Sequence, residues 1–132
     1  MGRRRQGRGH AALIPAATQP PHWAEERVAQ HLEGNGWRVL TRNYRLRGGE
    51  LDLVCEDQSG TVVMVEVKQR RSGVYGGAAA AIDQRKLAKL RRTASHFLAF
   101  ALERPDAAVR FDTVLVHGDR EHHRLEHLQD IA

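Results

Sequence analysis

Apolar and polar residues alternate on both sides of a short turn within residues 48–71, and this pattern predicts a β-hairpin. The turn runs from Asp57 to Gly60, and its final glycine suits a type I turn followed by a left-handed residue. The register that follows pairs Cys55 with Val63, Leu53 with Val65 and Leu51 with Val67 on one face, and Val54 with Met64, Asp52 with Glu66 and Glu50 with Lys68 on the other. A slip of one residue would mix apolar and charged side chains, so the hydrophobic pattern and the turn predict the same register.

The remaining patterns predict two helices and two more strands. Apolar residues spaced by four predict a helix over residues 22–33, and a second helix begins after Asp83 and ends before Pro105. Residues 37–46 predict a strand that completes a three-stranded antiparallel meander, with Trp37, Val39, Thr41 and Asn43 on one side. Residues 108–117 predict a buried strand that joins the sheet in parallel through a right-handed crossover. The fold class is therefore α/β, a mixed sheet flanked by helices, and the last residues predict a surface helix or a short strand.

Composition narrows the classes of protein to consider. A chain of 132 residues accommodates one domain, predicted over residues 22–132 after a flexible basic tail at residues 1–21. The net charge of +5 favours a polyanionic partner, and nucleic acid is the first candidate. No apolar run approaches the ~18 residues of a membrane span. The lone Cys55 forms no internal disulfide, which agrees with a cytoplasmic location.

The predicted pairing of Asp52 with Glu66 is the main chemical signal. Two like charges facing each other across a hairpin destabilise it unless a proton or a cation bridges them. Two carboxylates at the end of a buried sheet suit Mg²⁺ or Mn²⁺, with the backbone carbonyl of Val67 as a third ligand. Lys68 shares their face and is a candidate to hold the attacking water or the scissile phosphate. The alternative is a solvated strand end with a weak ion pair between Glu50 and Lys68.

Further candidate residues surround this pair. Glu25 falls inside the apolar sector of the first helix, so it requires a partner or reaches water at the boundary of the helix. On the second helix Lys86 and Arg91 flank the buried stripe and can reach the acids, whereas Arg85, Lys89 and Arg92 lie on the far side. The candidate contacts with nucleic acid are Lys86, Arg70, Arg45, Arg47 and Tyr75. The alternative is that these residues are ordinary surface groups.

Three stretches in combination, GGELDLV, VEVKQRR and YGGAAAAID followed by a Lys-rich helix, resemble the YraN family of predicted endonuclease-like proteins. That family is related to archaeal Holliday-junction resolvases within the PD-(D/E)xK nuclease fold. The resemblance implies a restriction-endonuclease-like core with Asp52, Glu66 and Lys68 as catalytic residues. It also implies that Glu25 joins the metal site and that Lys86 is the family's basic residue at the start of the helix. Leu51 stands where the superfamily's name has proline.

Two functions follow from these patterns. The first is a metal-dependent endonuclease that hydrolyses DNA phosphodiester bonds; branched DNA and a homodimer rest on the analogy with resolvases. The second is a nucleic-acid-binding accessory protein that keeps the nuclease-like fold without catalysis.

Overall fold

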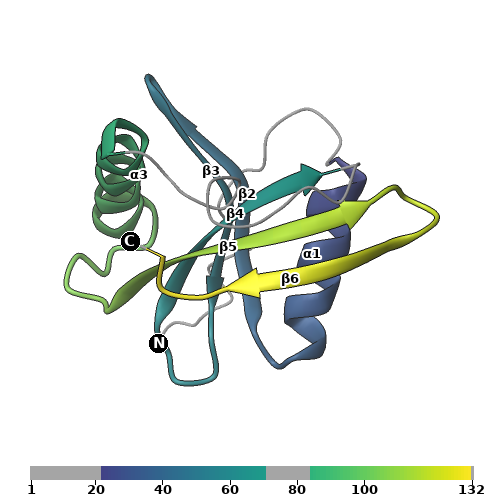
Figure 1. The fold of residues 1–132 in the computed structure, drawn as a ribbon. Helices are drawn as coiled ribbons and strands as arrows, with labels where there is room; N and C mark the ends of the chain where they lie inside the picture. The colour runs from purple at the N-terminus through teal and green to yellow at the C-terminus, as the bar shows by residue number, and fades with distance from the viewer. Residues whose placement is uncertain (1–21, 71–83, 132) are drawn as a thin grey trace.

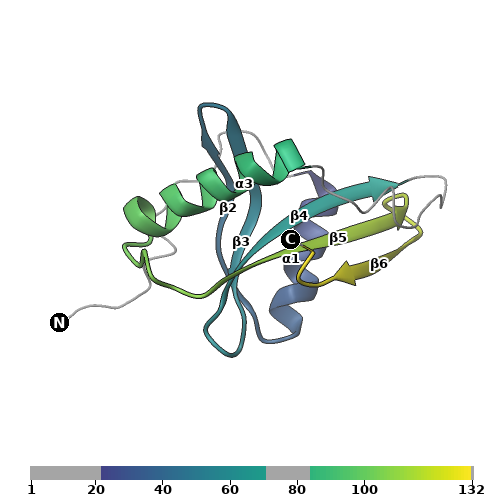
Figure 2. The same ribbon diagram turned by 60° about the vertical axis from the view of Figure 1, so that its left-hand side comes forward.

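The computed structural model describes residues 22–70 and 84–131, in which a mixed five-stranded sheet has the order β2-β3-β4-β5-β6. One helix covers each face of the sheet (Figure 1), and in the view of Figure 2 α3 lies in front of the sheet and α1 behind it. The elements are α1 (Trp23–Gly34), β2 (Arg38–Leu46), β3 (Gly49–Glu56), β4 (Val62–Arg70), α3 (Gln84–His96), a π-helical turn η2 (Phe97–Ala101), β5 (Val109–Gly118) and β6 (His123–Leu128). The predicted basic tail, Tyr75 and the capping residue Asp83 lie outside the described residues.

The fold class is the one that the sequence predicts. Strands β2, β3 and β4 form the antiparallel meander, and β5 joins β4 in parallel after α3. The last segment forms the antiparallel strand β6, which was one of the two alternatives. Within the described residues no helix is long and apolar enough to cross a membrane.

Helix α1 begins where the side chain of His22 accepts a hydrogen bond from the Ala24 N–H at 3.2 Å, which satisfies one of the free donors of the first turn. Its apolar stripe, which includes Val28 and Leu32, is fully buried against the sheet. The helix ends at Gly34, and Gly36 continues the chain with a φ of +88°, a conformation that favours glycine. The predicted helix is therefore confirmed almost to the residue.

The β3–β4 hairpin has the predicted turn and register. Gly60 has a φ of +90°, and its N–H donates to the Asp57 carbonyl at 3.0 Å. The Asp57 carboxylate also accepts from the N–H groups of Ser59 and Thr61, which closes the turn. The paired residues are Leu53 with Val65, Val54 with Met64, Cys55 with Val63 and Glu56 with Val62. The ladder ends at Leu53 and Val65, just before the two acids. The predicted pairs of Asp52 with Glu66, Leu51 with Val67 and Glu50 with Lys68 therefore lie beyond the paired residues and are not part of the ladder.

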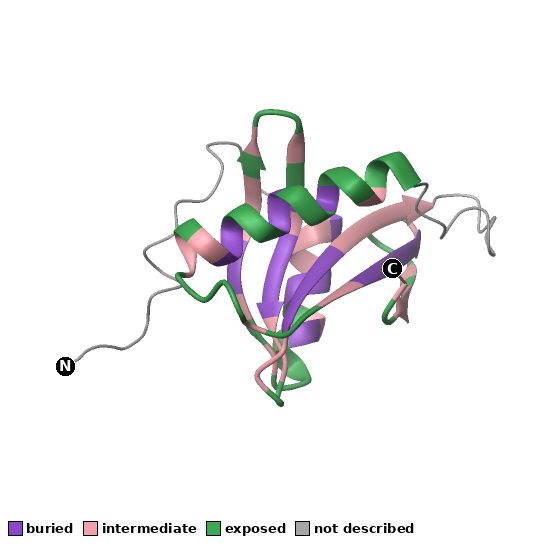
Figure 3. Cartoon of the chain, turned by 90° about the vertical axis from the view of Figure 1, so that its left-hand side faces the viewer, coloured by how far each residue is buried: buried purple, intermediate pink, exposed green. Residues whose placement is uncertain are grey.

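Buried residues form two cores, one on each face of the sheet, and the sheet centre is buried on both sides (Figure 3). Leu53 and Cys55 pack on the α1 side, whereas Leu51 packs on the α3 side with Leu90. The prediction that Leu51 shares a face with Leu53 is therefore wrong. The side-chain alternation of β3 breaks at Asp52, which lies between them.

Strand β2 also departs from regular alternation. Its register against β3 shifts between Val39 and Thr41, as a β-bulge does. Val39 packs on the α1 side, whereas Thr41 pairs with Val54 of the α3-side core. The prediction that Val39 and Thr41 share one side is wrong, because the bulge inserts Leu40 between them and reverses the face of Thr41.

Helix α3 and the π-helical turn η2 contribute the predicted inward residues to the α3-side core, among them Leu90 and Ala94 of α3 and Phe97 of η2. The predicted structural role of Asp112, in the middle of β5, is also confirmed. Its fully buried carboxylate accepts from Arg110 Nε at 2.9 Å and from the Asp130 N–H at 2.9 Å, and it lies 2.8 Å from His127 Nε2. Asp112 thereby joins β5, β6 and the C-terminal residues.

Candidate active site

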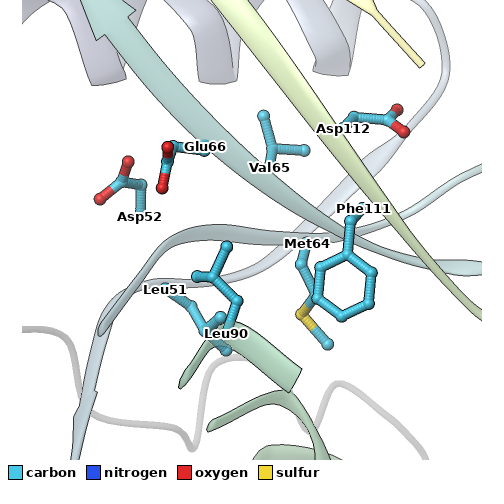
Figure 4. Close-up of a pocket in the computed structure, with 8 residues that line it drawn as sticks. All are labelled: Leu51, Asp52, Met64, Val65, Glu66, Leu90, Phe111 and Asp112. Carbon is cyan, nitrogen blue, oxygen red and sulfur yellow. The ribbon is translucent and has the colours of Figure 1, made fainter. Parts of the chain in front are cut away.

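Asp52 and Glu66 lie side by side where strands β3 and β4 separate (Figure 4). Both carboxylates border the same small pocket, together with Leu51 and Leu90. Asp112 lines this pocket too, but it lies on the far side of Val65 and is held by Arg110 and His127. The acids expected to converge from sequence therefore do converge, and Asp112 is separate from them.

The Asp52 carboxylate is held by the backbone of the neighbouring strand. The Val67 N–H donates to its Oδ2 atom at 3.0 Å. This contact forms beyond the end of the paired ladder, where the Val67 N–H meets a side chain of β3 in place of a backbone carbonyl. The predicted role of the Val67 carbonyl as a metal ligand stays a prediction.

Burial raises the pKa of Asp52 from 3.8 to about 7. The hydrogen bond from Val67 acts in the opposite direction, and the charges of Glu25, Glu66 and Glu50 raise the pKa further. In the metal-free protein the carboxyl therefore carries a proton at neutral pH about half of the time. A proton thus relieves the like-charge conflict that the sequence predicts for Asp52 and Glu66.

Glu66 is balanced by lysines from two elements. Its Oε1 atom lies 2.9 Å from Lys86 Nζ on α3 and 3.8 Å from Lys68 Nζ on β4. Burial lowers the pKa of Lys68, while the charge of Glu66 raises it. Lys86 therefore reaches the acids from the start of α3, as predicted, and Lys68 lies on their face of the sheet.

Glu25 lies near the pair but does not complete a ligand group with it. Burial and then the charge of Glu50 raise the pKa of Glu25, whereas a hydrogen bond with Asn43 lowers it. Its charge in turn raises the pKa of Asp52. Yet within residues 22–70 and 84–131 no three His, Cys, Asp or Glu side chains are arranged to hold a metal ion. A direct metal contact by Glu25 stays a prediction.

An open hollow of about 640 Å³ gives access to the two acids. Its walls are the turn at Gly48 and Gly49, the acids themselves, and the lysines Lys68, Lys86 and Lys89. The expectation that Lys89 lies on the far side of α3 is wrong, because Lys89 lines the hollow together with Lys86. Helix α3 crosses the strands of the sheet obliquely (Figure 2).

Gly49 lets β3 approach α3 closely at this hollow. A Cβ atom at Gly49 would lie 2.1 Å from Thr93 Oγ1 and 3.6 Å from the Lys89 carbonyl oxygen. Since a contact of 2.1 Å is far inside van der Waals distance, any side chain there pushes the helix from the strand. Sequence reasoning assigned Gly48 and Gly49 only to a turn, and the adjacent pair of glycines was the available signal for a close approach.

The residues present fit a hydrated divalent cation. Mg²⁺ usually keeps several waters and takes one or two carboxylates together with substrate phosphates, so a pair of acids is a sufficient protein contribution. The hollow is open to solvent, so a cation held there can keep its waters. The negative charges of Glu25, Glu66 and Glu50 act on Asp52, and a bound cation would offset them.

The other basic candidates lie around the strand ends. Arg45 pairs with Glu50 at 3.4 Å, with both side chains partly exposed, and Arg47 is exposed in the adjoining turn. Arg70 donates to the Gln69 carbonyl at 2.9 Å from Nη1. Tyr75 lies outside the described residues. Contacts of these four residues with nucleic acid stay predictions.

A model of the uncharacterised protein family UPF0102 matches residues 24–116. The chain belongs to this family. It is 47% identical to a UPF0102 protein of Dechloromonas aromatica over 97 residues, which are 74% of this chain and 78% of the relative. It is also 45% identical to a UPF0102 protein of Thermus thermophilus over 106 residues, 80% of this chain and 90% of the relative. These matches confirm the resemblance read from the sequence.

Among solved structures, the chain is similar to one described as an EndoMS-dsDNA2 complex. The TM-score is 0.39 and the sequences are 18% identical. The match covers 74% of this chain but only 37% of that one. A similarity at this level does not establish a shared activity.

Proposed function

We propose that this UPF0102 protein is a metal-dependent endonuclease that hydrolyses DNA phosphodiester bonds, with Asp52 and Glu66 holding Mg²⁺ or Mn²⁺. One observation carries the proposal: two partly buried carboxylates lie together beside an open hollow lined with lysines, and the pKa of one is raised to about 7. Carboxylates gathered in this way cost stability, and structural ion pairs alone do not require them.

Each residue has a role that its surroundings support. A bound divalent cation supplies positive charge to the phosphate oxygens and lowers the pKa of water. Asp52 holds the cation in its deprotonated form, so activity rises with pH through about 7. Lys68, whose pKa is lowered by burial, orients the attacking water or the scissile phosphate. Lys86 and Lys89 border the hollow and contact the phosphates that flank the bond.

The DNA partner is supported by charge. The chain carries a net charge of +5, and three lysines surround the acids. Arg45, Arg47, Arg70 and Tyr75 are the further contacts that we propose, and Glu25 is proposed to support the cation site. Branched DNA as the substrate, a homodimer that presents two sites to two strands, and a cytoplasmic location complete the proposal.

A cleavage assay tests this function. Linear, flapped and four-way DNA are incubated with wild type, Asp52→Asn or Glu121→Gln, each in Mg²⁺, Mn²⁺ or EDTA. Glu121 is an exposed acid in the turn between β5 and β6, so its variant makes the same chemical change away from the site. We expect metal-dependent cutting by wild type and Glu121→Gln, and none by Asp52→Asn.

The same assay distinguishes the accessory protein. Salt-sensitive binding of the DNA without cutting by wild type in either metal supports that alternative and contradicts the nuclease. Cutting by Asp52→Asn at the wild-type rate also contradicts the proposal, because the activity would then arise elsewhere.

A further inference from the structure

A second open groove, of about 880 Å³, lies between α1 and the turn that joins β5 to β6. Its lining residues are Trp23, Glu26, Arg27, Gln30, Arg120 and His123. None of these residues lines the hollow of Asp52 and Glu66. The proposed cleavage reaction therefore does not account for the groove.

Aromatic rings form one part of this groove. The ring of Trp23 lies 5.3 Å from that of His123, at an interplanar angle of 52°. The two rings are tilted and are not stacked face to face. The ring of His22 is a second neighbour, 5.8 Å from that of Trp23 at an interplanar angle of 30°. Trp23 is half-buried, because one part of the indole packs against the α1-side core and the rest borders the groove. Such a ring is fixed in place yet presents π surface to a ligand.

Positive charge forms the other part. Arg27 comes from α1 and Arg120 from the β5–β6 turn, and neither forms an ion pair within the part of the chain that the structure describes. The one acid of the groove, Glu26, is paired with Arg42 of β2. The groove therefore carries a net positive charge next to its aromatic surface.

We propose that this groove binds a stretch of unpaired nucleic acid, with a base stacked on Trp23 and the phosphates beside Arg27 and Arg120. Aromatic rings next to arginines are the combination that binds single strands, because every base has a π face and every linkage carries a negative charge. A duplex hides its base faces within its own stack, so an unpaired strand is the form that can use Trp23.

The groove adjoins the proposed cleavage site without depending on it. Glu25, between Trp23 and Glu26 in the first turn of α1, interacts electrostatically with Asp52. The first turn of α1 thus lies between the groove and the acids.

Intrinsic fluorescence tests the stacking in EDTA, where no cleavage occurs. Trp37→Phe leaves Trp23 as the single tryptophan, and phenylalanine keeps an aromatic ring near Arg110 and His127. We expect a short oligothymidylate to quench the emission of this protein. An abasic oligomer of equal length, which offers phosphates without bases, is expected to leave the emission unchanged. Equal quenching by both oligomers, or by neither, overturns the proposal.

Affinity measurements with a fluorescein-labelled oligothymidylate, also in EDTA, test the residues one at a time. Trp23→Leu is expected to weaken binding roughly 5- to 140-fold, the loss of one stacked base. Arg120→Gln, an exposed change that spares the core, is expected to lower the salt slope by about 0.7. Arg104→Gln, whose arginine pairs with Glu56 near the β3–β4 turn, is the matched control and keeps the full slope.

The proposal can be refuted even if one of these variants fails to fold. If Trp23→Leu fails to fold, Arg120→Gln and the single-tryptophan protein still decide it. The proposal is overturned if Arg120→Gln keeps the wild-type affinity and salt slope and if the emission of Trp23 shows no base-dependent quenching. Since all measurements are made without metal, loss of cleavage by other variants leaves the result unaffected.

Discussion

Replacing Asp52 with asparagine removes a partly buried carboxyl whose pKa rises to about 7. The amide is neutral at every pH and its oxygen can still accept the hydrogen bond from the Val67 N–H. The substitution therefore isolates the cost of ionising Asp52 in the folded protein. We expect Asp52→Asn to be more stable than wild type in EDTA, by an amount that depends on pH.

The sign and size of this effect follow from the two pKa values. Below pH 3.8 both the folded and the unfolded protein hold the proton, and the shift has no effect on the free energy of unfolding. Between 3.8 and about 7 only the folded protein holds it, so wild-type stability falls as pH rises. The loss relative to acid is roughly 2 kcal/mol at pH 5 and roughly 4 kcal/mol at pH 8. The advantage of Asp52→Asn should therefore grow by about 2 to 3 kcal/mol between these pH values.

Urea denaturation of both proteins in EDTA at pH 5 and pH 8 measures this difference. Other titrating groups are shared by the two proteins and cancel in the comparison, and Glu121→Gln should follow wild type at both pH values. Adding Mn²⁺ at pH 8 should stabilise wild type and leave Asp52→Asn unchanged. An advantage of Asp52→Asn that stays constant from pH 5 to pH 8 would refute the raised pKa, and with it the electrostatic argument for a cation.

Three further predictions concern single positions. Glu66→Gln should abolish cleavage yet change the free energy of unfolding by less than about 1 kcal/mol, because the Lys86 that pairs with Glu66 is half-exposed. A larger loss of stability in urea denaturation would make Glu66 a structural residue. Asp112→Ala should lower the free energy of unfolding by about 3 to 5 kcal/mol, since Arg110 and His127 lose a buried partner. Mn²⁺ binding at pH 8 should persist in this variant. Loss of that binding in the folded protein would contradict the separation of Asp112 from the site. Gly49→Ala should lower the free energy of unfolding by about 1 to 3 kcal/mol through the clash with Thr93. In a double-mutant cycle, Thr93→Ala should recover part of this loss. Losses that simply add in the double mutant would contradict the contact.

Much of the fold follows from local patterns in the sequence. The β3–β4 register was predictable because Asp57 and Gly60 define the turn and the apolar residues allow one alignment. The parallel strand β5 was predictable because it follows a helix and is apolar on both faces. The convergence of Asp52 and Glu66 followed from that register.

Two of the misplaced residues lie where a strand departs from regular alternation, and the third lies on α3. The β-bulge between Val39 and Thr41 has no marker such as glycine, so alternation alone assigned Thr41 to the wrong face. Leu51 was misassigned because the alternation of β3 breaks at Asp52, a feature that depends on how β4 separates and on how α3 packs. Lys89 was misplaced because a helical wheel does not show the angle at which α3 crosses the sheet.

Mn²⁺ titration followed by electron paramagnetic resonance tests the cation site most directly, because the signal of the free ion disappears as it binds. At pH 8 we expect wild type and Glu121→Gln to bind one tightly held ion per chain, and Asp52→Asn and Glu66→Gln to lose it. Wild type that leaves the signal of the free ion unchanged, or variants that bind Mn²⁺ as wild type does, would contradict the assignment of Asp52 and Glu66 as the ligands.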